Sequence, residues 1–330
     1  MAKSDEDFPL AKYTDELADR LRALVPAALQ DGDVEAIHQA RVTTRRLRAA
    51  LNLLASVIPA KTQKPVAKTL KRLRRELGPL RDADVMLGHL AELKRYPRHA
   101  AAIEWLERHV QARRQRAATE ALDDAPPAKT LSRLGAWWGV SEQIAGAREA
   151  VDTLLAESLH NQLESFTAAA EPLLHEAQQN VQGANPHAVR IAGKLLRYTV
   201  EMAAVEGHKL PKDVLRSFKK MQDALGYWHD YVVLTETAME ICVDEMLPAT
   251  DPVMQQHVMN LIALALKRSQ AHLKKFADLW KERGREISDA IRAAFPNPRA
   301  VIEPKTDPGP AGSIDIPAPA ADAPDRPAAF

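Results

Sequence analysis

Apolar residues recur with helical spacing along most of the chain. In residues 10–30, for example, Leu10, Leu17, Leu21 and Leu24 are separated by three, four or seven positions, which predicts an amphipathic helix. The same spacing, bounded by Gly and Pro turns, predicts further helices over 34–58, 61–77, 80–95, 98–122, 148–180, 186–206, 211–225, 227–247 and 253–294. No segment alternates with the period of two expected of a strand, so the predicted fold class is all-α.

Several of these boundaries rest on specific residues. Asp33 follows a turn at Gly32 and is the expected N-cap of the next helix. The Gly78-Pro79 pair is a helix-stop signal, and we expect the chain to break there and at the matching Gly226. On this interpretation Asp82 and Asp230 lie in the first turn of a new helix, where they would either cap it or orient a neighbouring Arg or His.

Two basic helices share one pattern. His and three cations lie at i, i+3, i+7 and i+10, within about 80° of arc on a helix, and the set recurs 149 residues later: His38, Arg41, Arg45, Arg48 and His187, Arg190, Lys194, Arg197. The following helices match at an offset of 148, including Asp82 with Asp230 and the cations Lys64, Lys68, Lys71, Arg72 with Lys212, Arg216, Lys219, Lys220. The chain is therefore interpreted as a duplication of one helical unit, at about 10–122 and 159–294.

The remaining segments are a connector and a tail. Residues 123–158 contain a Pro126-Pro127 break and the pair Trp137-Trp138, which we expect to pack as an apolar plug between the two modules, with a ligand-stacking platform as the alternative. Residues 295–330 are rich in Pro, Ala and Asp and are predicted to be disordered, as a plain tail or as a tether.

The charge is unevenly distributed. The net charge of +1 combines a segment from His38 to Arg116, with 19 Lys and Arg against 6 Asp and Glu, and a remainder of net −12. Such a basic module indicates a polyanionic partner. The single Cys242 excludes a disulfide framework and a CxxC zinc site, and no apolar run has signal-peptide or transmembrane length, so we expect a cytoplasmic protein with no membrane partner.

The aligned cations predict anion binding. Like charges about 5 Å apart along a helix repel each other, few acids are interspersed, and Arg can fork onto phosphate oxygens. Beside a bound phosphate, His38 and His187 would be held protonated and would donate from both ring nitrogens. The alternatives are solvated basic faces and histidines that merely pack or cap.

Other functions have weaker support. The sequence Glu35-Ala-Ile-His38 is an ExxH pair, as in carboxylate-bridged metal bundles, and Glu157-Ser-Leu-His160 is another, but Ala184 replaces Glu35 in the second copy. A His-dependent phosphotransfer or metal-binding bundle therefore stays open as the alternative function. No catalytic or dinucleotide motif occurs, so we expect neither an enzyme nor a cofactor, and nucleic acid is disfavoured because no aromatics interleave with the cations.

Four segments in order resemble the CHAD domain, the conserved histidine α-helical domain. They are HQARVTTRRLRAAL and LGPLRDADVML in the first half, and PHAVRIAGKLLRYTVEM and MQDALGYWHDYVVL in the second. The resemblance covers about residues 10–294 and implies two pseudo-symmetric four-helix bundles around a basic cavity or groove, without a CYTH triphosphatase domain. It implies that the two sets of cations and histidines above bind inorganic polyphosphate, at polyphosphate granules and beside other granule-associated proteins. The sequence departs from a strict repeat at Gly193 inside the second basic helix and at Leu195 where the first copy has Arg46, which makes Arg46 a less certain contact.

Overall fold

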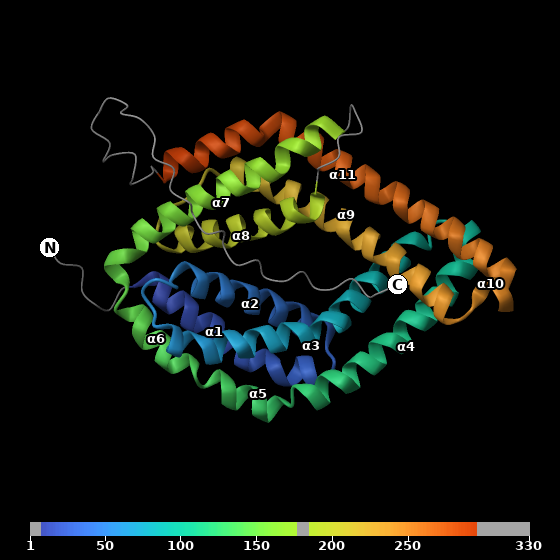
Figure 1. Cartoon of the computed structure of the whole chain (residues 1–330), viewed down its shortest axis with the longest axis horizontal. Helices are drawn as coiled ribbons and strands as arrows, with labels where there is room; N and C mark the ends of the chain where they lie inside the picture. Colours follow the sequence, from blue (N-terminus) through green and yellow to red (C-terminus); the bar gives the residue numbers. More distant parts are fainter. Residues whose placement is uncertain (1–7, 177–184, 296–330) are drawn as a thin grey trace, which may run out of the picture. The chain divides into compact units, whose positions relative to one another are not determined.

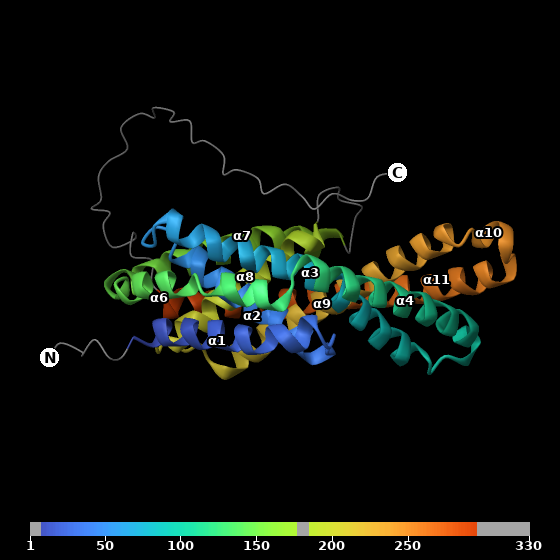
Figure 2. The same cartoon turned by 90° about the horizontal axis from the view of Figure 1, so that it is seen from below.

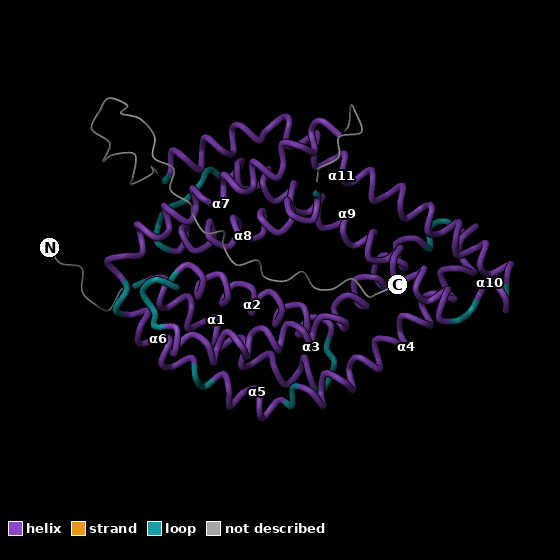
Figure 3. The backbone as a smooth tube through the Cα atoms, in the orientation of Figure 1, coloured by secondary structure: helices purple, strands orange, loops and turns teal. Residues whose placement is uncertain are grey.

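The computed structural model describes residues 8–176 and 185–295, and in these ranges the chain forms helices joined by turns, with no strand (Figures 1 and 3). The all-α prediction is confirmed. The predicted tail beyond Phe295 and the end of the predicted helix 148–180 lie outside the described residues.

The helices follow the sequence prediction closely at most ends. They are α1 (Pro9–Leu29), α2 (Val34–Leu53), α3 (Ala60–Leu93), the 3-10 helix η1 (Pro97–His99), α4 (Ala100–Asp124), α5 (Pro127–Leu134), α6 (Trp137–Ala145), α7 (Arg148–Glu176), α8 (Pro186–Val205), α9 (Lys212–Asp244), α10 (Leu247–Thr250) and α11 (Pro252–Ala294). Asp33 is the N-cap of α2, as predicted: its carboxylate accepts from the Ala36 amide at 2.7 Å. Gly32 just before it has φ +62°, a conformation that favours glycine.

The predicted breaks at Gly78-Pro79 and Gly226 are wrong. α3 and α9 each run unbroken through these positions. The apolar stripe of α3 continues across the proline, from buried Leu73 and Leu77 to Leu80 and Ala83, so tertiary packing outweighs the local breaker. Asp82 and Asp230 therefore lie in the middle of long helices, and the first-turn capping role is excluded.

The two halves use the same packing order. α1 packs on α2, α2 on α3 and α3 on α4; in the second half α7 packs on α8, α8 on α9 and α9 on α11. α2 also packs on α8, and α4 lies beside α11 (Figures 1 and 2). This order is compatible with an internal duplication.

The connector is mostly helical. It contains α5, α6 and the first turns of α7. Trp137 is buried in the core and donates from its indole to Asp15 at 2.7 Å, whereas Trp138 is 72% exposed. α6 packs on α1 and α3 of the first half. The prediction that both tryptophans are packed between the modules was therefore wrong for the exposed Trp138.

Two apolar clusters build the core. The larger one combines α1, α2 and α5–α8 with the first halves of α3 and α9 and the last part of α11. The smaller one combines the second halves of α3 and α9 with α4 and the first part of α11. In α3 the larger cluster ends at Leu80 and the smaller begins at Ala83; in α9 they meet between Leu225 and Tyr231. Asp82 and Asp230 lie at these two junctions.

Candidate functional site

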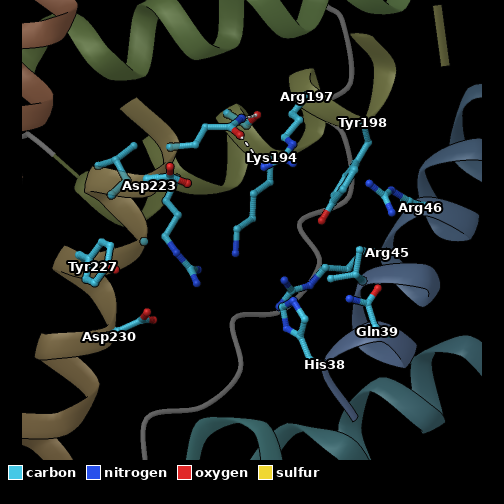
Figure 4. A pocket seen from close by; sticks show the side chains of 16 residues that line it. His38, Gln39, Arg45, Arg46, Lys194, Arg197, Tyr198, Asp223, Tyr227 and Asp230 are labelled. Carbon is cyan, nitrogen blue, oxygen red and sulfur yellow. Dashed lines mark hydrogen bonds between the residues drawn. The ribbon is translucent and has the colours of Figure 1, made fainter. Parts of the chain in front are cut away.

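A recess of about 500 Å³ opens between α2, α8 and α9 (Figure 4). Cationic side chains from both halves line it. α2 contributes Arg45 and Arg46, with His38 about two helical turns before Arg45, and α8 contributes Arg190, Lys194 and Arg197. The repeated spacing found in the sequence therefore places one basic face of each half on a single concave surface.

The local sequence explains why these side chains point into the recess. The opposite face of α2 buries Ile37, Ala40 and Leu47, which leaves the i, i+7 pair His38 and Arg45 on the open side. α8 buries Val189, Gly193, Leu196 and Val200 in the same manner, so its cations face α2.

Gly193 has a packing role. A Cβ atom at this position would lie 3.1 Å from Cε2 of Phe166, a buried ring that packs against Phe218 and Trp280. The Gly193 carbonyl accepts from Nε2 of Gln222 on α9 at 2.6 Å. The departure from the first copy at this position thus allows α8 to approach α7 closely.

Arg41 is partly buried below the first basic face. Its side chain is 12% exposed, and its Nη1 donates to the Arg74 carbonyl at 2.9 Å, one turn before Gly78. Its Nη2 lies 4.0 Å from Oδ1 of Asp82. Burial lowers the pKa of Arg41 to about 10, although the carboxylate of Asp82 opposes this. Arg41 is therefore partly structural, because it ties α2 to a main-chain carbonyl of α3.

The two repeated acids lie close to the cations of both halves. Desolvation raises the pKa of Asp82, which is offset in part by Arg41 and Arg45 and increased by Asp230. Asp230 lines the recess directly, and its charge opposes the lowered pKa of Arg190. An acid from each half thus stands beside the arginine at the same place in the repeat.

The recess carries crowded positive charge. Burial and then the neighbouring Arg45 and Arg190 lower the pKa of Lys194 to about 6. The pKa of His38 is lowered by burial and by Arg81, and the pKa of His187 by burial and by Arg190. Burial and Arg190 also lower the pKa of His229 to about 4. Each shift disfavours a further positive charge, so an anion in the recess would reverse the unfavourable interactions.

Glu201 bridges the two basic helices. Its carboxylate accepts from Nε of Arg46 on α2 at 2.8 Å and from Nε of Arg197 on α8 at 3.0 Å. Arg46, which the sequence comparison made less certain, therefore borders the recess with its charge already paired.

The second set of predicted cations lies outside the recess. Arg72 is half buried and donates to the Asp124 carbonyl, while the others are exposed on α3 and α9: Lys64, Lys68, Lys71, Lys212, Arg216, Lys219 and Lys220. An α-helix turns by 100° per residue, so Lys64, Lys68 and Lys71 point within about 40° of the direction of Asp82. Lys212, Arg216 and Lys219 have the same angular relation to Asp230 on α9. These two rows thus continue along the helix faces that carry Asp82 and Asp230, of which Asp230 lines the recess.

The other two predicted residues have different surroundings. His187 is exposed at the start of α8, with its ring 5.6 Å from that of His229. Arg48 is half buried on α2 and does not line the recess.

Sequence reasoning missed several recess residues. Gln39 and Tyr198 lie beside predicted cations, whereas Gln222, Asp223 and Tyr227 come from α9, one or two turns before Asp230. Counting back from Asp230 by helical turns would have found Tyr227 and Asp223, once α9 was recognised as continuous.

The described residues give no cluster for a metal. No group of three or more His, Cys, Asp or Glu within 8–176 and 185–295 could hold an ion. In the two ExxH pairs, Glu35 accepts from Gln39 at 2.5 Å and His160 lies 3.0 Å from Glu164. Across the same ranges, no helix is sufficiently long and apolar to cross a membrane.

Comparison with known proteins gives a family match and two similar structures. The family model described as the CHAD domain matches residues 12–238. The crystal structure of the CHAD domain from the plant Ricinus communis is 22% identical, with a TM-score of 0.55, and the match covers 87% of this chain and 90% of that one. PptA from Streptomyces chartreusis is also 22% identical, with a TM-score of 0.52, and the match covers 81% of this chain and 99% of that one. No curated protein matches.

Proposed function

Because the chain belongs to the CHAD domain family, we propose that it binds inorganic polyphosphate, with the recess between α2, α8 and α9 as the central contact. The proposal is one of binding rather than catalysis, and it extends to association with polyphosphate granules and their other proteins in the cytoplasm. Family membership supports polyphosphate binding as a hypothesis. The charges of the recess support it on physical grounds.

The observation that carries the proposal is the concentration of cations from both halves on one concave surface. Burial lowers the pKa of Lys194 most, and Arg45 and Arg190 lower it further because the like charges repel one another. Glu201 accepts hydrogen bonds from Arg46 and Arg197. Asp82 and Asp230 attract Arg45 and Lys194 only at longer range, and among the described residues neither cation forms a direct ion pair. A chain of phosphates supplies the missing negative charge, and arginine binds phosphate oxygens in a fork.

The exposed rows on α3 and α9 support a long ligand. Lys64 and Asp82 are 18 positions apart on one helix face, which corresponds to about 27 Å along the axis. A recess of about 500 Å³ holds only a short part of a polymer, and the flanking rows can contact phosphates that extend from it. Affinity should therefore increase with chain length until both rows are covered.

The test is a titration of the full chain with long-chain polyphosphate over a salt series. Counterion release predicts that log K falls steeply and linearly with log salt. The double variant Arg45→Glu with Lys194→Glu should lose at least a hundredfold in affinity at low salt. A double variant with two exposed cations changed elsewhere, Arg116→Glu with Lys129→Glu, is the matched control and should lose far less. Binding with no salt slope, or equal loss in the two variants, would exclude the recess as the site.

A further inference from the structure

The recess has two chemically different sides. Figure 4 shows Arg45 and His38 on α2 along one side, and Asp223, Tyr227 and Asp230 on α9 along the other, with Lys194 between them. Carboxylates repel a phosphate chain, so the α9 side is not the wall that a polyanion alone requires. It is suited to a group that is uncharged and donates hydrogen bonds.

At and beside the α9 positions that form this side, the second half differs from the first. The two halves align at an offset of 148 residues. In this alignment Arg74 faces Gln222, Arg75 faces Asp223, Pro79 faces Tyr227 and Arg81 faces His229. A site for a uniform polymer has no need of unlike walls. Fewer cations and an aromatic ring on the α9 side fit a ligand with two unlike ends.

Tyr227 is held as a fixed ring at the edge of the recess. Its ring stacks on His272 of α11, with centroids 4.9 Å apart and planes 12° apart. His89 of α3 meets it edge-on, with centroids 5.7 Å apart and planes 63° apart. Tyr227 nevertheless remains 41% exposed, and a Cβ atom on the adjacent Gly226 would have no neighbour within 4 Å. The ring is thus supported from behind and has open space beside it.

We infer that the α9 side of the recess binds the base of a purine nucleoside polyphosphate, while the phosphates of the same ligand contact Arg45, Arg190 and Lys194. The inference rests on the proposed phosphate binding of the recess. Base stacking on Tyr227 and acceptance of amino or ring N–H groups by Asp230 or Asp223 are the contacts that this wall offers. The volume of about 500 Å³ also lies within the range of about 300–1,000 Å³ that is usual for small-ligand sites.

The experiment compares ATP and GTP with tripolyphosphate by calorimetry on the full chain, at one salt concentration and without divalent cations. The base should add about five- to tenfold in affinity over tripolyphosphate, in line with one aromatic stacking contact. Tyr227→Ala should remove this advantage, and Tyr227→Phe should keep it. Trp138→Ala, which removes an exposed tryptophan away from the recess, is the control and should change neither affinity.

The outcomes separate this inference from the proposed function. If tripolyphosphate binds but neither nucleotide binds more tightly, the inference is overturned and phosphate binding stands. If the advantage persists in Tyr227→Ala while that variant still binds tripolyphosphate, the base does not stack on Tyr227 and the inference is again overturned. If no ligand, long-chain polyphosphate included, binds at all, the proposed function itself fails.

Discussion

Lys194 provides the sharpest test of the electrostatics of the recess. Burial beside Arg45 and Arg190 lowers its pKa to about 6, so it is neutral in the ligand-free protein at pH 8.5. A bound phosphate chain places negative charge beside it and favours the ammonium form. Polyphosphate binding should therefore be accompanied by proton uptake.

The magnitude follows from two protonation equilibria. With a pKa of about 6, roughly 0.3% of Lys194 is protonated at pH 8.5; with the ordinary lysine pKa of about 10.4, about 99% would be. Uptake should thus approach one proton per recess. The sign is fixed, because the bound state holds more protons: affinity falls as pH rises between about 6 and 10, by up to about tenfold per unit.

The assay is calorimetric titration with polyphosphate at pH 8.5 in two buffers of different ionisation enthalpy. The difference in apparent heat gives the number of protons taken up. His38, His187 and His229 are neutral at this pH before binding, because their pKa values lie below the ordinary 6.5. A histidine adds to the uptake at pH 8.5 only where bound phosphate raises its pKa by two units or more above about 6.5, and the variant below measures that part separately.

The matched variant is Lys194→Met, which keeps an unbranched side chain but cannot titrate. It should bind more weakly and take up almost no proton at pH 8.5. Equal proton uptake in both proteins, or none in the unmodified one while it binds, would refute the assignment of the shift to Lys194 and to its crowding by Arg45 and Arg190.

Three further changes test the packing around the recess. Gly193→Ala should lower the free energy of unfolding by about 1 kcal/mol in denaturant melts, because its Cβ would lie 3.1 Å from the fixed ring of Phe166; an increase in stability would show that this ring can move. Glu201→Gln should cost about 1 kcal/mol and tighten polyphosphate binding several-fold at low salt, because Arg46 and Arg197 lose their shared counterion; weaker binding would mean that Glu201 positions them instead. Arg41→Ala should cost about 1–3 kcal/mol in thermal unfolding, because the Arg74 carbonyl loses its donor, and a neutral effect would show that water replaces the guanidinium.

Periodicity and repetition made much of the fold and the main cations of the recess predictable. α8 was expected at 186–206 and is Pro186–Val205, because its apolar stripe and the Pro at its start are local signals. The spacing of Arg45, Arg190 and Lys194 was sufficient to place them on one face of each helix. These properties depend on a single helix and can therefore be predicted from the sequence.

What depends on contacts between helices was not predictable. Gly78-Pro79 has the local signature of a stop, and only the continuous burial of Leu77 and Leu80 shows that α3 passes through it. Tyr227 joins the recess because α9 packs beside α8, and its support comes from His272, 45 positions later. The outer cation rows had the same repeat signal as the inner ones, yet they lie outside the recess.

The arrangement of the larger core has a consequence for how the protein loses its structure. This cluster draws on α1 and α2 from the first half and on α7 and α8 from the second, so neither half encloses a complete interior. The second halves of α3 and α9 belong to the smaller cluster, so these two helices join both clusters. Melting should accordingly be one cooperative transition rather than two, and a fragment that ends in the connector should remain unfolded or self-associate. The repeat is visible in the sequence, but we expect the two halves to fold together as one cooperative unit.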